Sequence, residues 1–169
     1  MWASTVRSTR RTGRRVRAHC DSPIPAIQFA RLSGFYPIIT TASPKNTDFL
    51  KSLGATHVID RNIPLSDLPD IVKNITEQPI DLIYAAVSPA DIQQAAYDML
   101  ANDGTLIIVL NPTIDESKRV PSKYIADTFG NPYFPDRRQL SAELWRRIPA
   151  LFESGDLKVL SKPSPVYAG

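Results

Sequence analysis

The sequence predicts an α/β fold built on a doubly wound parallel sheet with helices on both faces. From Ala26 onward, short runs of apolar and β-branched residues alternate with segments of helical spacing. This alternation is typical of parallel strands joined by crossover helices. One run, IDLIYAAV over residues 80–87, is apolar enough to predict a strand at the centre of such a sheet.

Five segments carry the signals of helices. Residues 26–32 (AIQFARL) precede Gly34, and Ser43-Pro44 begins a second helix that ends before Gly54. An N-cap serine, a proline at the first helical position and a glycine after the last turn mark such boundaries. In the other three helices, apolar residues recur at intervals of three and four: Leu68, Ile71, Val72 and Ile75; Ile92, Ala95, Ala96 and Met99; and Leu140, Leu144, Ile148, Leu151 and Phe152.

The predicted strands lie between these helices. They cover residues 36–41, 57–60, 80–87, 105–110, 124–129 and 157–160. Pro37 cannot donate to a sheet ladder, so it indicates the beginning of the first of them. Asn102-Asp103-Gly104 predicts a turn before the strand at 105–110.

The composition excludes several classes of protein. With 43% hydrophobic and 22% charged residues, the chain is typical of a globular domain. Its apolar runs are too short to cross a membrane. One cysteine and two histidines exclude an internal disulfide framework and a recognisable zinc site, so no metal ligands are assigned.

The first 25 residues differ from the rest of the chain. They hold six arginines between Arg7 and Arg17, without which the formal charge falls from +3 to −3. A slightly acidic body argues against a nucleic-acid-binding surface. Three interpretations of this segment are open: a transit peptide, a disordered basic arm for an acidic partner, or an aberrant start from mis-joined coding sequence. We favour the third and expect a cytoplasmic protein, whereas a transit peptide would indicate mitochondria.

A strand and a glycine-rich turn are expected immediately before Ala26, where a doubly wound sheet holds the pyrophosphate of a dinucleotide. The sequence has Ser22-Pro23-Ile24-Pro25 there, and no two of its seven glycines are spaced as G-x-G. Proline has no N–H to donate. We therefore expect a sheet that lacks its first strand and its glycine-rich loop, that exposes apolar edges and aggregates, and that binds a dinucleotide weakly or not at all.

The run AIQFARLSGFYPIITTASPKNTDFLKSLGATHVID, residues 26–60, resembles the medium-chain dehydrogenase/reductase superfamily. The resemblance is to its zinc-independent quinone-oxidoreductase and enoyl-reductase branch, and it extends over IDLIYAAVS, GTLIIVL and the run from Leu144 to Lys158. It implies a Rossmann-like domain that binds NADP, in an enzyme that reduces activated C=C bonds, quinones or carbonyls with NADPH. The family's substrate domain has no counterpart in this sequence.

The resemblance also implies a set of cofactor-binding residues. Ser43, Lys45 and Asn46, just past a strand, would contact the ribose phosphate that distinguishes NADP from NAD; the alternative is that Ser43 only caps a helix and Lys45 is a solvated charge. Arg61 would lie near the adenine or its phosphate, although we interpret it as a surface charge. Val87, Ser88, Leu110 and Asn111, at the ends of two later strands, would line the nicotinamide path. No catalytic residue is identified.

These observations predict three parts: a basic segment, residues 1–25; a partial Rossmann NADP-binding domain, residues 26–160; and a flexible tail, residues 161–169. The predicted function is that of a partial cofactor-binding domain with weak or no activity of its own and a small-molecule substrate in the intact enzyme. The alternative is a non-catalytic interaction module that pairs through an exposed sheet edge. A homodimer through such an edge is a further possibility.

Overall fold

The computed structural model describes residues 16–19, 24–86, 89–109, 111–127, 135 and 138–158. The chain divides into two compact units, residues 1–129 and 130–169. Each unit is described by itself. No described helix is long and apolar enough to cross a membrane.

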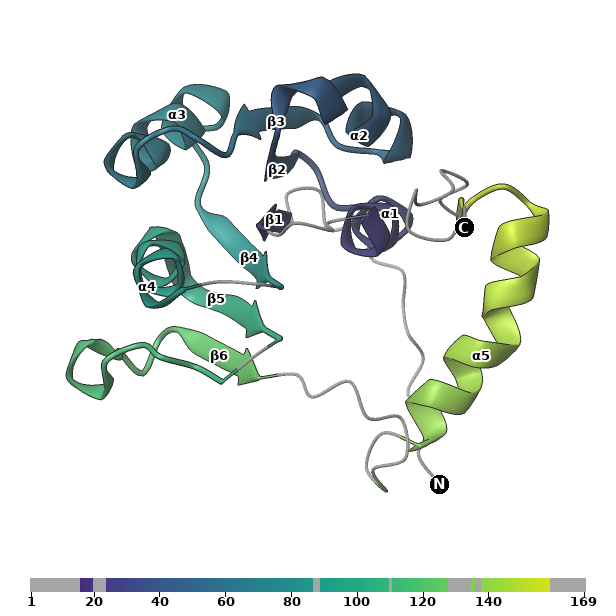
Figure 1. Cartoon of the computed structure of the whole chain (residues 1–169). Helices are drawn as coiled ribbons and strands as arrows, with labels where there is room; N and C mark the ends of the chain where they lie inside the picture. The colour runs from purple at the N-terminus through teal and green to yellow at the C-terminus, as the bar shows by residue number, and fades with distance from the viewer. Residues whose placement is uncertain are drawn as a thin grey trace, which may run out of the picture. The chain divides into compact units, whose positions relative to one another are not determined.

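The first unit is built on one parallel sheet of six strands, in the order β3-β2-β1-β4-β5-β6 (Figure 1). Every neighbouring pair runs parallel. The strands are β1 (Val16–His19), β2 (Ile38–Ala42), β3 (His57–Asp60), β4 (Ile80–Ala85), β5 (Leu100–Ile108) and β6 (Tyr124–Asp127). The strand order runs outward in both directions from β1 and β4, so the prediction of a Rossmann-like, doubly wound sheet is confirmed.

The expected absence of the first strand is wrong. Val16–His19, inside the arginine-rich segment, forms β1 and pairs with both β2 and β4. Val16-Arg17-Ala18-His19 alternates between apolar and polar residues over only four positions, whereas the central strand of a parallel sheet is expected to be a continuous apolar run. β1 therefore occupies the gap between β2 and β4 whose exposed strand edges were expected to cause aggregation and edge pairing. The outer strands of the sheet are β3 and β6.

Helices cover both faces of the sheet, as the sequence predicts. α1 (Ile24–Leu32) and α2 (Thr47–Leu53) lie on one face, and α3 (Leu68–Ile75) and α4 (Ala90–Met99) lie on the other (Figure 1). On the α1 side, Ile27 and Ala30 pack with Ile38 and with Leu50 and Leu53 of α2. α1 begins two residues before the predicted start, and Pro25 occupies its first turn where a missing N–H costs no intrahelical bond.

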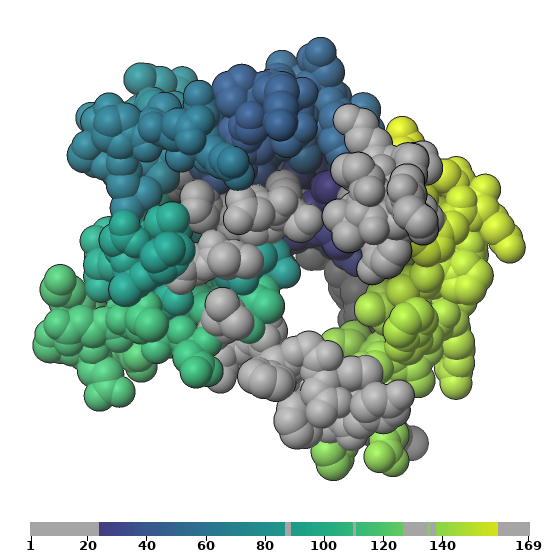
Figure 2. All heavy atoms as spheres, in the orientation of Figure 1, coloured from purple at the N-terminus to yellow at the C-terminus, as the bar shows by residue number. Residues whose placement is uncertain are grey.

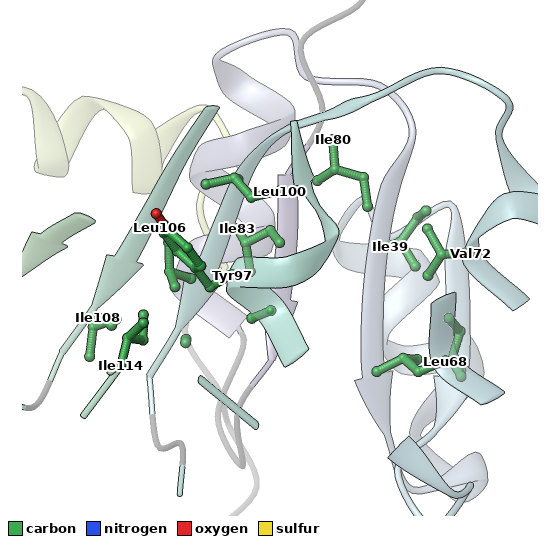
Figure 3. Close-up of a cluster of buried hydrophobic side chains, with 13 residues drawn as sticks. Ile39, Leu68, Val72, Ile80, Ile83, Tyr97, Leu100, Leu106, Ile108 and Ile114 are labelled. Carbon is green, nitrogen blue, oxygen red and sulfur yellow. The ribbon is translucent and has the colours of Figure 1, made fainter. Parts of the chain in front are cut away.

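The larger core cluster joins α3 and α4 to the centre of the sheet (Figure 3). Ile83, Leu106 and Ile108 are completely buried there, and Tyr97 of α4 is 2% exposed. Burial of this many large side chains supplies the main driving force for folding of the unit.

In the first unit, two glycines that follow helices have a positive φ. Gly34 follows α1 with φ 76°, and Gly54 follows α2 with φ 121°. Residues that carry a side chain rarely adopt a positive φ, which is why glycine is favoured after the last helical turn. At Gly54 a Cβ atom would also lie 2.7 Å from Cδ of Arg31, so this position excludes other residues on two grounds.

The predicted turn at Asn102-Asp103-Gly104 is part of a strand. Ile80 pairs with Leu100, but Leu82 pairs with Thr105, so residues 101–104 form an irregularity within β5. Asp103 takes a φ of 61° there, and its N–H donates to the Ser122 carbonyl. Turn-forming residues are also those that permit a bulge, and only the pairing decides between the two.

The second unit contains α5 (Arg138–Glu153), the final helix that the apolar spacing predicts. Glu143 pairs with Arg147 one turn later, at 2.7 Å between carboxylate and guanidinium, and Gly155 follows with φ 75°. Of the strand predicted at 157–160, Leu157 and Lys158 are not in a strand, and residues 159 and 160 lie outside the described residues.

Candidate functional site

The candidate site is the edge of the sheet at which the strands end. Because all six strands run parallel, their carboxyl ends lie at one edge. The strand order reverses between β1 and β4, and ligands of doubly wound sheets bind outside the carboxyl ends at this reversal. The segments that follow β1, β2, β4 and β5 therefore border the candidate site.

Ser43, Lys45 and Asn46 follow the carboxyl end of β2. They form the start of a single 3₁₀ turn, η1 (Pro44–Asn46), which continues into α2. The Ser43 carbonyl accepts from the Asn46 N–H at 2.9 Å. Ser43 stands at the N-cap position, but its hydroxyl makes no capping hydrogen bond, so helix capping does not account for it. Lys45 is exposed.

The structure brings Arg61 to the same place. The Arg61 N–H donates to the Ala42 carbonyl at 3.1 Å, which fixes the end of β3 beside the residue before Ser43. η1 lies against β3, and the Arg61 side chain is exposed. Arg61 is thus one strand away from Lys45, at the same edge, and its interpretation as an isolated surface charge is incomplete.

A carboxylate stands directly before Arg61 in the chain. Asp60, the last residue of β3, accepts at Oδ1 from the backbone N–H of Asn62 at 3.0 Å and from the Asn62 side-chain amide at 3.1 Å. These two bonds hold the carboxylate toward the turn after β3. The edge formed by Ser43, Lys45, Asn46 and Arg61, the β2–β3 edge, therefore offers a hydroxyl, an amide and two cations to an anionic group.

The turn between β1 and α1 offers less. Residues 20–23 lie outside the described residues, and the sequence from Arg14 to Ser33 contains no glycine. Pro25, in the first turn of α1, has no N–H to direct at a phosphate. The residues present thus fit the adenosine end of a dinucleotide phosphate, and they fit the pyrophosphate less well than a glycine-rich turn would.

On the other side of the reversal, the predicted residues Val87, Ser88 and Leu110 lie outside the described residues. The backbone that follows Leu110 is held by the side chain of Gln93, in the first turns of α4. Its Oε1 accepts from the Thr113 N–H at 2.8 Å, and its Nε2 donates to the Asn111 carbonyl at 3.4 Å. Sequence reasoning missed Gln93, although its spacing of four from Tyr97 and seven from Leu100 could have placed it on the buried face of α4.

Among the residues that the structure describes, no group of three or more His, Cys, Asp and Glu side chains could hold a metal ion. We therefore assign no metal site among the described residues. No catalytic residue is assigned among the residues that the structure describes.

A comparison with protein families decides the relationship. The family model described as zinc-binding dehydrogenase matches residues 24–129. The chain belongs to this family. The match runs from α1 to the end of β6. It confirms the resemblance to the medium-chain dehydrogenase/reductase superfamily and its enoyl-reductase-like members.

Curated relatives are trans-enoyl reductases of fungi. The chain is 31% identical over 153 residues to the enoyl reductase component of lovastatin nonaketide synthase from Aspergillus terreus, covering 78% of this chain and 39% of that protein. It is 34% identical over 149 residues to a trans-enoyl reductase of Penicillium oxalicum, with the same two coverages. The chain spans less than half the length of the curated relatives it matches.

A solved structure supports the fold. The nucleotide-binding subdomain of the enoylreductase domain of PpsC from Mycobacterium tuberculosis has a TM-score of 0.67 at 21% identity, with coverage of 88% of this chain and 87% of that one. At this identity the likeness shows the fold alone.

Proposed function

We propose that this chain is the cofactor-binding part of an NADPH-dependent oxidoreductase that reduces activated C=C bonds. The observation that carries the proposal is the β2–β3 edge, where Ser43, Lys45 and Arg61 gather at the carboxyl ends of two strands. In a doubly wound sheet this position faces the ribose of the adenosine half. A carboxylate there hydrogen-bonds the ribose hydroxyl of NAD, whereas cations accommodate the additional phosphate of NADP.

Each side chain has a role in this proposal. The Ser43 hydroxyl and the Asn46 amide donate to the phosphate oxygens, and Lys45 supplies a compact charge next to them. Arg61 supplies a planar guanidinium that can bind two oxygens at once. Because Lys45 and Arg61 are both exposed, their attraction to the phosphate weakens as salt increases.

The nicotinamide, when bound, supplies the hydride. The chain's own contribution is to position it: Val87 and Ser88 after β4, with Leu110 after β5, are proposed to line its path. Pro23 and Pro25 have no N–H to donate to the pyrophosphate, so we expect the chain to bind the cofactor weakly and to have low activity by itself.

The substrate class is proposed from the relatives. Their names describe trans-enoyl reductases, which favours a 2-enoyl thioester over a quinone or a simple carbonyl. A mycobacterial protein of the same fold was solved in complex with NADPH, with a TM-score of 0.72 at 20% identity over 90% of this chain and 51% of that one. The proposed cofactor is therefore NADP(H), and the whole enzyme's reaction is the reduction of an enoyl double bond.

A fluorescence titration with NADPH, with NADH as the reference ligand, tests the proposal. We expect saturable binding that prefers NADPH. Lys45→Ala removes a charge-assisted contact of about 1.5–3 kcal/mol, so it should weaken NADPH binding about 10–100-fold and leave NADH binding unchanged.

Lys73→Ala is the matched control. Lys73 is an exposed lysine in the last turn of α3, and α3 leads to the opposite edge of the sheet, where β4 begins. This variant should bind NADPH as the unchanged chain does. Equal affinity for NADPH and NADH, or no binding of either up to millimolar concentration, would contradict the proposal.

A further inference from the structure

The buried face of α4 carries two polar side chains that hold loop backbone at opposite edges of the sheet. Gln93 and Tyr97 lie one helical turn apart, and each is 2% exposed. Gln93 bonds the loop after β5, at the carboxyl edge. Tyr97 bonds the loop before β6, at the amino edge, since its hydroxyl accepts from the Val120 N–H at 2.8 Å.

Of these two contacts, only that of Gln93 lies at the carboxyl edge, where the candidate site is. In the space-filling view, α4 and the segment before β6 lie against each other (Figure 2), in agreement with the Lys123 ammonium, which donates to the Tyr97 carbonyl at 2.9 Å. That contact is part of the ordinary packing of the domain. Gln93 instead connects the first turns of the helix after β4 with Asn111 and Thr113 after β5, so it joins the segments that follow β4, which lies beside the reversal point, and its neighbour β5.

The chemistry of Gln93 suits this task. A buried amide that lacks partners costs about 1–3 kcal/mol, so Gln93 is retained only where the loop backbone satisfies it. Its acceptor and its donor fall on two residues of one short loop, Thr113 and Asn111. Two bonds from one side chain fix both the position and the orientation of that loop, which a single apolar contact cannot do.

We propose that Gln93 is a positioning residue for the nicotinamide half of the cofactor. It holds residues 111–113 at the carboxyl edge in the arrangement that the nicotinamide and its ribose require. This inference rests on the proposed function, since it assumes that the chain binds NADP(H). We expect the affinity for the adenosine half to be independent of Gln93, because the β2–β3 edge is formed by other strands.

Two ligands separate the halves of the site. NADPH spans both, whereas 2′,5′-ADP contains only the adenosine half and its phosphate. In Gln93→Met, a side chain of similar length fills the core without hydrogen bonds. We expect NADPH affinity to fall about tenfold, the loss of roughly one hydrogen-bonded contact, while the affinity for 2′,5′-ADP stays within about twofold.

Tyr97→Phe is the matched control, because it removes a buried hydroxyl bonded to backbone from the same helix at the other edge. It should destabilise the domain and leave both affinities unchanged. If Gln93→Met fails to fold, Thr113→Pro removes the same hydrogen bond from an exposed loop position and should reproduce the selective loss.

The outcomes are distinguishable. A selective loss of NADPH affinity supports the positioning role. An equal loss of affinity for both ligands, or no loss of either affinity, overturns the positioning role and leaves Gln93 a structural residue. The positioning role is also overturned if the unchanged chain binds NADPH no more tightly than 2′,5′-ADP. If the unchanged chain binds neither ligand, the proposed function itself has failed.

Discussion

Replacement of Ala18 by proline tests whether Val16–His19 is the central strand. Ala18 pairs with Thr40 on one side and with Tyr84 on the other. A four-residue strand between two parallel neighbours makes about eight ladder hydrogen bonds. At about 0.5–1.5 kcal/mol each, they contribute about 4–12 kcal/mol, which is comparable to the whole stability of a domain.

Proline at position 18 removes one of these bonds and leaves a carbonyl of the neighbouring strand without its donor, at a cost of about 1–3 kcal/mol. Its ring also occupies the space in which that strand approaches, so adjacent bonds break as well. We expect a loss of about 3–5 kcal/mol in the free energy of unfolding. With a urea dependence of roughly 1–3 kcal/mol per molar, the midpoint of unfolding falls by about 1–5 M.

The assay is urea denaturation followed by circular dichroism, with Ala18→Gly as the control at the same position. Glycine retains the N–H and costs only about 0.5–1 kcal/mol in a strand. If the midpoint of the proline variant lies within about 0.5 M of the glycine variant, Val16–His19 is not an interior strand. The reasoning that places β1 between β2 and β4 would then be refuted.

Three further predictions concern the described core and loops. Leu106→Ala removes a completely buried side chain from β5 and should lower the free energy of unfolding by about 2–5 kcal/mol; a urea midpoint equal to that of the unchanged chain would contradict it. Thr56→Val should cost about 1–3 kcal/mol in the same assay, because Thr56 Oγ1 accepts from the N–H of buried Ile38 and donates to its carbonyl, both at 2.9 Å, whereas Thr56→Ser keeps both bonds. The pKa of Asp115 is lowered from 3.8, first by a hydrogen bond from the Ser117 hydroxyl and second by one from the Ser117 N–H. The Asp115 carboxylate therefore contributes to stability above pH 3.8, and this contribution is lost as the pH falls through the folded-state pKa. An NMR titration should show this pKa rise toward 3.8 in Ser117→Ala, and an unchanged pKa would mean that the hydroxyl is not its main cause.

Local signals in the sequence determined most of the helices and strands. The cap-proline-glycine pattern from Ser43 to Gly54 and the apolar spacing from Leu68 to Ile75 depend on neighbours a few residues away. The structure places η1 and α2 in the first segment and α3 in the second. The alternation of these elements was also enough to predict the parallel sheet, since a crossover helix requires parallel neighbours.

The tertiary structure decided what depends on distant partners. β1 exists because β2 and β4 bond to it from both sides, although its four residues do not form the continuous apolar run expected of a central parallel strand. Residues 101–104 became a bulge because of how β5 pairs with β4. Arg61 joined the candidate site because its N–H donates to Ala42 on a neighbouring strand, and Gln93 was found through its bonds to a loop about 20 residues later. The sequence by itself thus indicated the family, most of the elements, and the residues Ser43, Lys45 and Asn46 as adenosine-side candidates. Contacts between residues far apart in the chain decided which side chains meet at the edge, because hydrogen-bond pairing between strands leaves little trace in the local order of residues.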